Sequence, residues 1–222
     1  MQLYLVRHGE SSNNALIGDN FDYDHYMATR NSDPPLTEIG EVQAERVGDF
    51  FAAASFSIDE VYCSPMTRAM QTALPIGRGL GLSPIVWIDI HEHSGIFQGN
   101  PRNGSRHGAP GITRAAARQR FPDYTLPDEM TEDGWYFGDY EEMDACDVRA
   151  RRVATRLRDR ADEDAVLALV SHGTFIDRLI KALFQQTRNG QDFFYFQNNT
   201  SITCLEFQEK GLVILRYSNH VK

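Results

Sequence analysis

Two apolar runs in this sequence end directly in a histidine that is followed by glycine. Residues 3–6 are apolar enough for a buried strand, and Arg7-His8-Gly9 follows at once. Residues 166–170 run into Ser171-His172-Gly173 in the same manner. Ligands of open α/β sheets bind at the carboxyl ends of the strands, which share one edge. The pattern therefore predicts an α/β fold in which both histidines belong to one site.

The rest of the chain alternates between strand and helix patterns. Further strands are expected at residues 57–63, 85–88, 201–207 and 212–217. Helices are expected at residues 66–80, where Pro75 should disturb the middle, at 147–160 and at 175–184. Another helix begins at Thr37 and should cover the sheet with Ile39, Val42, Val47, Phe50 and Phe51. The order indicates a mostly parallel sheet covered on both faces, ending in an antiparallel hairpin linked by residues 208–211.

Two segments do not follow this rhythm. Residues 15–33 and 93–144 have little readable structure and are interpreted as insertions that cover the site. The second contains one helical pattern at 113–121 and the cluster Trp135-Tyr136-Phe137, which is more typical of packing than of a substrate cap. A chain of 222 residues with 41% hydrophobic composition fits one domain, 1–222, better than two small ones.

Charge and cysteine content limit the partners and the compartment. Acidic residues outnumber basic residues by 31 to 22, giving a net charge of −9, which disfavours a nucleic-acid partner. Cys63, Cys146 and Cys204 are odd in number and scattered, and no leader pattern precedes the first strand, so a reduced, cytoplasmic protein is expected. No apolar stretch approaches the roughly 18–20 residues that span a bilayer, so no membrane partner is expected. The oligomeric state is not indicated.

The strand-end residues suit phosphoryl transfer. A phosphoryl group spreads negative charge over its outer oxygens and needs fixed cationic donors around them. Arg7 stands beside His8, Arg68 follows the strand that ends at Cys63, and His172 can add a further nitrogen. A neutral imidazole can attack phosphorus and divide one difficult transfer into two easier ones.

The remaining parts of such a site also have candidates. A leaving alkoxide needs a proton donor, and Glu92 follows a predicted strand closely enough to supply it. Ser11 and Asn14 follow His8 and are expected to contact the phosphate. Gly173, like the glycine after His8, should allow a close approach of backbone and substrate.

Blocks of sequence containing these residues occur in an order that resembles a known family. The blocks are Leu5-Val6-Arg7-His8-Gly9-Glu10-Ser11 with Asn14, Leu36-Thr37-Glu38-Ile39-Gly40 with Gln43-Ala44, Tyr62-Cys63-Ser64-Pro65 with Arg68-Ala69 and Gln71-Thr72, Glu92 with Gly95 and Gly99, Val170-Ser171-His172-Gly173, and Asn199-Thr200-Ser201. Together they resemble the histidine phosphatase superfamily, also called the phosphoglycerate mutase-like family.

The resemblance implies a fold and a mechanism. It implies a three-layer αβα sandwich, with a mostly parallel sheet and an antiparallel edge strand, and no metal or cofactor. It implies that His8 becomes phosphorylated and that Glu92 acts as acid and then as base. The remaining residues, Arg7, Arg68 and His172, would hold the phosphoryl oxygens. The expected function is hydrolysis of a small-molecule phosphate monoester.

Two departures from the family's mutases bear on the substrate. In those enzymes the catalytic glutamate is followed by Arg-His-Tyr-Gly, whereas Glu92 is followed by His93-Ser94-Gly95, which favours a phosphatase over a cofactor-dependent phosphoglycerate mutase. The mutases also carry Thr-Gly where this chain has Thr29-Arg30. Arg30 would place a cation near the pocket mouth, so we hypothesise a substrate with a second anionic group.

Other interpretations are weaker. His91-Glu92-His93 lacks a third ligand at defined spacing and is weak evidence for a metal. Cys63 and Arg68 are separated by four residues rather than the five of cysteine-based phosphatases, and Ser171 has no G-x-S-x-G context. A solvated helix face with ion pairs is expected for Arg149, Arg151, Arg152 and Arg156. A non-catalytic binding protein on the same fold is the remaining alternative.

Overall fold

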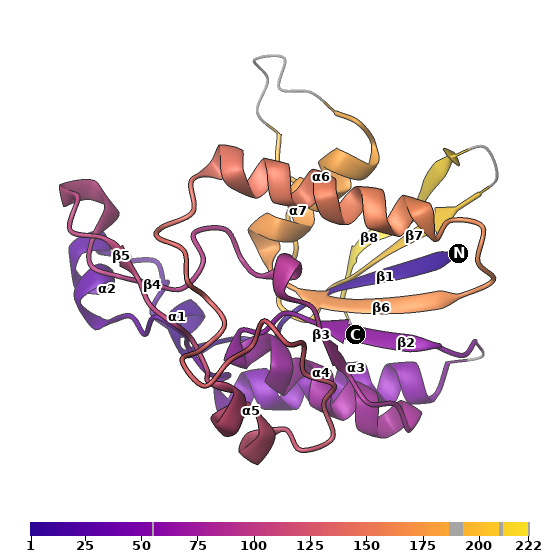
Figure 1. Cartoon of the computed structure of the whole chain (residues 1–222), viewed down its shortest axis with the longest axis horizontal. Coiled ribbons are helices and arrows are strands. Elements are labelled where there is room, and N and C mark those ends of the chain that lie inside the picture. Colours follow the sequence, from indigo (N-terminus) through magenta and orange to yellow (C-terminus); the bar gives the residue numbers. More distant parts are fainter. Residues whose placement is uncertain (55, 187–192, 209–210, 222) are drawn as a thin grey trace.

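The protein is built on a six-stranded sheet, seen here in a computed structural model that describes residues 1–54, 56–186, 193–208 and 211–221 (Figure 1). The strand order is β3-β2-β6-β1-β7-β8. The strands are β1 (Gln2–Arg7), β2 (Glu60–Cys63), β3 (Ile85–Val86), β6 (Val166–Ser171), β7 (Ile202–Phe207) and β8 (Val213–His220). Both histidine strands, β1 and β6, are therefore central and adjacent.

Pairing directions agree with the expected α/β sheet. Strand β6 pairs in parallel with β1 and β2, and β2 pairs in parallel with β3. Strand β7 runs antiparallel between β1 and β8, one position inside the edge, because β8 adds to its outer side. The predicted antiparallel pairing of the last two strands is confirmed, although residues 209–210 of the expected link lie outside the described residues.

Helices cover both faces of the sheet, as Figure 1 shows. Helices α3 (Glu38–Ala52) and α4 (Thr67–Leu80) lie on one face, and α6 (Met143–Asp159) and α7 (Gly173–Leu183) lie on the other. Alternate side chains of β1 divide between the two cores: Tyr4 and Val6 belong to the cluster on the α3/α4 side, and Leu3 and Leu5 belong to the other. The three-layer αβα arrangement is thus confirmed.

The buried face of α3 agrees with the prediction at Val47, Phe50 and Phe51, which pack on the core, and differs from it at the start of the helix. Ile39 and Val42 are 60% and 54% exposed. Small residues form most of the buried face instead, and a Cβ built on Gly40 would lie 2.0 Å from the carbonyl oxygen of Glu10. A Cβ on Gly9 would likewise lie 2.5 Å from the Gly40 oxygen, so Gly9 allows α3 to approach rather than a substrate. The apolar pattern missed this because small residues carry no hydrophobic signal.

The other helices and strands deviate less from expectation. Helix α4 runs through Pro75 without ending there. Strand β3 is shorter than predicted, because a single 3₁₀ turn begins at Ile88. Within the described residues, no helix is both long and apolar enough to span a membrane.

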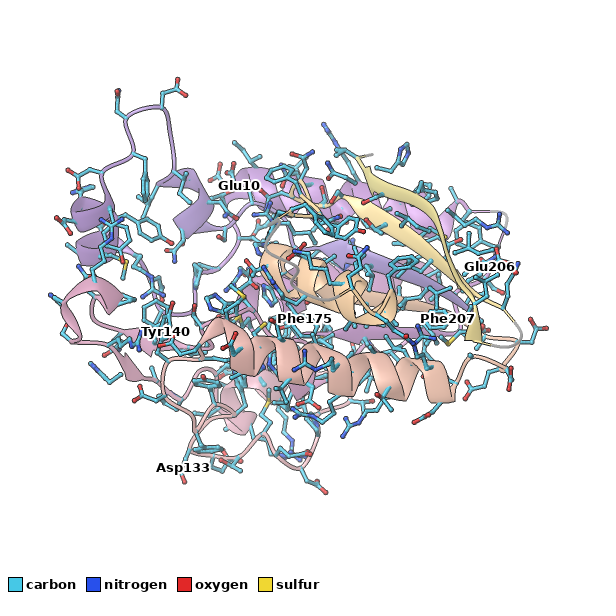
Figure 2. All side chains as sticks on the ribbon, turned by 90° about the horizontal axis from the view of Figure 1, so that it is seen from above. Glu10, Asp133, Tyr140, Phe175, Glu206 and Phe207 are labelled. Atoms are coloured by element: carbon cyan, nitrogen blue, oxygen red, sulfur yellow. The ribbon has the colours of Figure 1, made fainter. Side chains whose placement is uncertain are left out.

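Most of the two irregular segments lies at the end of the molecule beyond the carboxyl ends of β1 and β6, whereas residues 112–130 pack against the core on the α3/α4 side (Figure 1). They contain α2 (Tyr23–Thr29), β4 (Phe97–Gln98), β5 (His107–Gly108), α5 (Arg114–Arg120) and a short 3₁₀ turn at Pro101–Asn103. Helix α1 (Ser12–Ala15) leads into the first segment, and a second 3₁₀ turn, Ile88–Ile90, precedes the other. Seen from above, Tyr140 lies at this end, and Glu206 and Phe207 lie at the opposite end of the sheet (Figure 2). The expected packing role holds for the buried Trp135 but not for Phe137, which is 66% exposed.

Guanidinium and aromatic groups join the two segments. The Arg30 guanidinium lies 4.0 Å from the centre of the Phe97 ring, and the Arg102 guanidinium lies 3.5 Å from that of Tyr23. Arg30 Nη1 also donates to the Phe97 carbonyl oxygen at 3.0 Å. A single contact between a guanidinium and an aromatic ring is weak. The two segments are therefore joined by the combined effect of these contacts.

Candidate active site

A pocket of about 290 Å³ lies where β1 and β6 end and α4 begins. Polar side chains make up most of its wall. The lining residues are Arg7, His8, Ser11, Asn13, Asn14, Tyr26, Arg30, Ser32, Pro34, Met66, Arg68, Glu92, His93, Ser94, Gly95, Phe97 and Thr174. Seven of the nine site residues predicted from the sequence line this wall, and the other two, His172 and Gly173, lie directly beside it.

His8 is held with one ring nitrogen ready to act as a nucleophile. Its Nδ1 lies 2.6 Å from the carbonyl oxygen of Gly9, to which only a protonated Nδ1 can donate. Its Nε2 accepts a hydrogen bond from Arg68 Nε at 3.1 Å. In a neutral ring these two contacts place the lone pair on Nε2. The ring is buried at the end of β1, so its orientation is fixed by the sheet.

The electrostatic surroundings favour the neutral form of both histidines. Burial, reinforced by the positive charges of Arg68 and Arg7, lowers the pKa of His8 well below its usual value of 6.5. Burial, with the charge of Arg68, lowers the pKa of His172 in the same direction. Both imidazoles are therefore uncharged at neutral pH, and the uncharged form is the nucleophilic one.

His172 lies beside His8, as the two strand ends predicted. The ring centroids are 5.1 Å apart. His172 Nε2 lies 2.7 Å from Ser64 Oγ, which fixes the ring. Among the described residues, nothing bonds to His172 Nδ1 or to Arg7 Nε, and both atoms are buried. Buried polar atoms normally have partners, so these two are suited to bind a ligand.

The two arginines reach the site from different elements. Arg7 ends β1, and its Nη1 donates to the Gln197 carbonyl oxygen at 2.5 Å. Arg68 lies in the first turn of α4, buried, with Nη1 3.9 Å from an Asp33 carboxylate oxygen. The same carboxylate accepts the backbone N–H of Thr67 at 3.1 Å, so Asp33 caps α4 from outside the helix. Burial raises the pKa of Asp33, against the opposing charge of Arg68.

Glu92 is fixed at the N-terminal end of α7, near Arg7 and Arg68 in the pocket wall. Its Oε1 accepts from the backbone N–H groups of Phe175 and His93 at 2.9 and 2.8 Å. Its Oε2 accepts from the Thr174 N–H alone, at 3.2 Å. Oε2 therefore has room for a proton or a substrate hydrogen bond, whereas Oε1 is fully used.

Ser11 and Asn14 line the pocket, and their side chains are also hydrogen-bonded to each other. Ser11 caps α1 and donates from Oγ to Asn14 Oδ1 at 3.0 Å. Asn199 Nδ2 donates to that same oxygen at 3.2 Å and to the His8 carbonyl at 3.0 Å. Their arrangement supports the first turn after His8. At Gly173, a Cβ would lie 3.5 Å from Arg7 Nε, which is an ordinary contact.

The outer wall contains residues that the sequence did not single out. Tyr26, Ser32, Phe97 and the 93–95 turn join Arg30 there. Arg30 is half-buried and is held by Phe97, as described above. These residues lie in the segments without clear periodicity, so no pattern pointed to them.

The alternative metal and thiol sites are not supported by the geometry. His91 and His93 face different neighbours, Trp135 at 5.4 Å and Tyr140 at 6.0 Å between ring centroids. In the part of the chain that is described, no group of three or more histidine, cysteine and carboxylate side chains could hold a metal ion. Cys63 is fully buried, and burial raises the pKa of its thiol.

The expectation for Arg149 is wrong. The charged helix pattern predicts a solvated position, but Arg149 is only 4% exposed and donates to backbone carbonyl oxygens and to the Glu141 carboxylate. Arg152 and Arg156 do lie on the exposed face and pair with Asp89. A single helix therefore presents arginines to two different environments.

Comparison with known proteins gives one family. A model described as the histidine phosphatase superfamily (branch 1) matches residues 3–220. The chain is 27% identical over 172 residues to ecdysteroid-phosphate phosphatase of Bombyx mori, a match covering 72% of this chain and 24% of that protein. It is 32% identical over 106 residues to 2,3-bisphosphoglycerate-dependent phosphoglycerate mutase of Treponema pallidum, covering 45% of this chain and 38% of that protein. Both matches thus span well under half of the relative.

A solved structure resembles the whole chain. A mycobacterial glucosyl-3-phosphoglycerate phosphatase in complex with VO3 aligns with a TM-score of 0.60 at 21% identity, covering 99% of each chain. At this identity the similarity establishes the fold.

Proposed function

Because the chain belongs to the histidine phosphatase superfamily, we propose that it hydrolyses a small-molecule phosphate monoester through a phosphohistidine formed on His8. One observation carries the proposal: the unprotonated Nε2 of a neutral, buried His8 lies beside Arg68, Arg7 and His172. A nucleophile surrounded by cationic and neutral donors is what transfer of a dianionic group requires.

In the first step the His8 Nε2 lone pair forms a bond to phosphorus. The ester P–O bond breaks, and its electron pair passes to the leaving oxygen, which takes a proton from Glu92 Oε2. Arg68 Nε donates to Nε2 in the free site, so this hydrogen bond must pass to a phosphoryl oxygen as phosphorus approaches. Arg7 Nε and His172 Nδ1, both buried and without protein partners among the described residues, are placed to donate to the other oxygens.

In the second step water attacks the phosphohistidine. Glu92, now a carboxylate, accepts a proton from the water at Oε2. The N–P bond breaks, its electron pair returns to Nε2, and inorganic phosphate leaves. The same carboxylate therefore serves as acid and then as base. Because protein side chains supply the nucleophile, the acid and base, and the donors to the phosphoryl oxygens, we propose that no metal takes part, and activity should persist in excess EDTA.

The outer wall bears on the substrate. Arg30 is half-buried, lines the pocket and is restrained by the Phe97 ring and carbonyl oxygen. A restrained guanidinium favours a planar anionic group such as a carboxylate or a second phosphate. We therefore expect a phosphate monoester whose leaving group carries a second negative charge.

The relative from Treponema pallidum makes a mutase the second candidate function. The two differ in where the phosphoryl group goes. The test is incubation of 3-phosphoglycerate with a trace of 2,3-bisphosphoglycerate, together with a panel of phosphorylated metabolites. Release of inorganic phosphate supports the phosphatase, and formation of 2-phosphoglycerate supports the mutase. Absence of turnover on the whole panel would favour a non-catalytic binding protein.

A further inference from the structure

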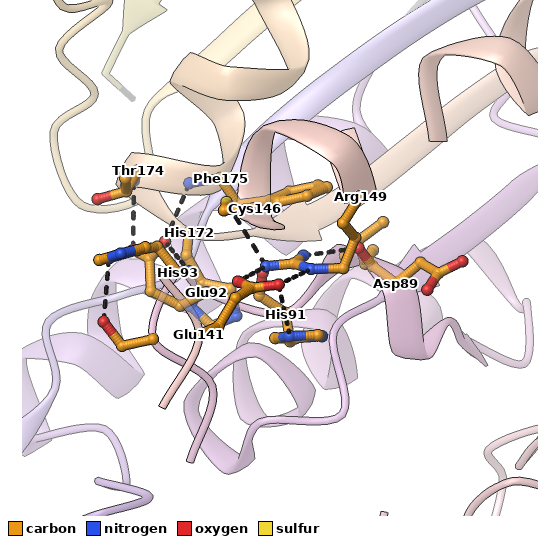
Figure 3. A network of polar contacts seen from close by, with 12 residues as sticks. Asp89, His91, Glu92, His93, Glu141, Cys146, Arg149, His172, Thr174 and Phe175 are labelled. Carbon is orange, nitrogen blue, oxygen red and sulfur yellow. Dashed lines mark hydrogen bonds and ion pairs between the residues drawn. The ribbon is translucent and has the colours of Figure 1, made fainter. Parts of the chain in front are cut away.

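Arg149 is a buried arginine on α6 whose guanidinium joins separate segments of the chain (Figure 3). Its Nη1 donates to the carbonyl oxygens of Asp89 and His91 at 2.8 Å each. Its Nε and Nη2 donate to the two carboxylate oxygens of Glu141 at 2.8 and 2.5 Å. The guanidinium carbon lies 4.6 Å from the centre of the Phe175 ring. A planar fork of five donors allows one side chain to make all of these contacts.

The segment that leads into Glu92 is held from outside the pocket. Arg149 binds the first and third of three successive carbonyl groups, those of residues 89 and 91. Ser171 Oγ donates to the carbonyl oxygen between them, that of Ile90, at 2.7 Å. The backbone before Glu92 cannot shift without breaking buried hydrogen bonds.

Arg149 also acts on the groups that hold the Glu92 carboxylate. Phe175, whose ring packs on the guanidinium, donates its backbone N–H to Glu92 Oε1. Glu141, the ion-pair partner, donates its backbone N–H to the Ser94 carbonyl oxygen at 3.3 Å. The contacts therefore reach the chain before Glu92, the chain after it and the helix end that binds its carboxylate.

We propose that Arg149 is a positioning residue that keeps the Glu92 carboxylate in place for proton transfer to and from the reacting oxygens. The inference rests on the proposed role of Glu92 as acid and base. Arg149 does not line the pocket, so any effect of its hydrogen bonds on the proton transfer runs through the position of Glu92. Proton transfer needs a heavy-atom separation of about 2.6–3.2 Å, and a misplacement of about 1 Å can cost roughly 100-fold in rate.

Leaving groups of different basicity separate this role from a general loss of structure. The alkoxide that leaves from a simple alkyl phosphate needs a proton from the acid. The 2,4-dinitrophenolate that leaves from 2,4-dinitrophenyl phosphate is a stable anion and needs none. Arg149→Lys keeps a positive charge beside Glu141 but cannot make both pairs of bonds. We expect kcat/KM to fall about 30-fold for the alkyl ester and less than about 3-fold for the dinitrophenyl ester.

The base step supplies a second readout. With the dinitrophenyl ester, a misplaced Glu92 should slow hydrolysis of the phosphohistidine, so Arg149→Lys should release a burst of about one equivalent of dinitrophenolate. The matched control is Arg152→Met on the same helix, because Arg152 is half-exposed and, among the described residues, donates its hydrogen bonds to the side chain of Asp89. Arg152→Met should change kcat/KM by less than about 2-fold for both esters.

The reference variant is Glu92→Gln, which should show the same preference for the dinitrophenyl ester. If it shows none, the proposed role of Glu92 fails, and the inference fails with it. If Glu92→Gln shows the preference but Arg149→Lys slows both esters equally, only the inference is overturned. Should Arg149→Lys not fold, Glu141→Gln weakens the same ion pair and must give the same pattern.

Discussion

The inner and outer ends of the pocket are built in different ways. At the inner end, Arg7, His8 and His172 come directly from strand ends, and Arg68 comes from the first turn of α4. At the outer end, Arg30 and Phe97 come from short elements joined by guanidinium and aromatic contacts. Chemistry that needs fixed geometry lies on the rigid sheet, and the groups expected to select the substrate lie on the irregular segments.

The largest effect on activity is expected from removing an arginine at the inner end. Arg68→Ala should lower kcat/KM by about 10³-fold for every phosphate ester, because in the proposed mechanism Arg68 donates to the phosphoryl group that all of them share. Steady-state kinetics on the substrate panel, with a melting curve to check the fold, measures this. A loss confined to some substrates would place Arg68 outside the phosphoryl site.

Buried histidines make the stability of the folded protein sensitive to acid. Burial, with the charge of Arg149, lowers the pKa of His91 to about 4, so the unfolded chain binds a proton there that the folded chain does not. This stabilisation is complete above the unfolded pKa of 6.5 and is lost as the pH falls toward 4. The contribution of His91 to the free energy of unfolding should fall by about 2 kcal/mol between pH 7 and pH 5.

Urea unfolding of the wild type and of His91→Asn at both pH values measures the contribution of His91 to the free energy of unfolding. The His8 and His172 contributions have the same sign and remain in the variant, since their pKa values are also lowered by burial. The loss of stability on acidification should therefore be smaller, but not absent, in His91→Asn. Equal losses in the two proteins would show that His91 is protonated to the same extent in the folded and unfolded states.

The smallest effect is expected at the outer end. Arg30→Ala should lower kcat/KM about 10-fold for esters with a second anionic group and less than about 2-fold for esters without one. The measurement is the ranking of substrates by kcat/KM. An unchanged ranking would remove Arg30 from the specificity determinants and weaken the contrast between the two ends.

The same contrast explains what could be predicted from sequence. The sequence predicts that His8 and His172 lie together, because each follows an apolar run and the carboxyl ends of parallel strands share one edge of the sheet. Arg68 followed from the position of its strand in the same way. These signals are local in the sequence, and the parallel sheet converts them into proximity.

The errors have a physical origin as well. Ile39 and Val42 were assigned to the buried face of α3, but Gly40 and Ala44 allow the close approach there. For Arg149 the charged helix pattern predicts a surface position; its partner Glu141 lies in the segment without periodicity, so no pattern indicated the buried ion pair. The cytoplasmic location and the single-domain organisation stay predictions.

The central claim is a phosphoryl group carried by His8. Wild-type protein mixed with a ³²P-labelled ester and quenched in alkali should retain label, which acid should then release, because phosphohistidine is stable to base and labile to acid. His8→Ala should retain none, and Arg30→Ala should still be labelled. An unlabelled wild type under conditions of measured turnover, or equal labelling of His8→Ala, would contradict the account.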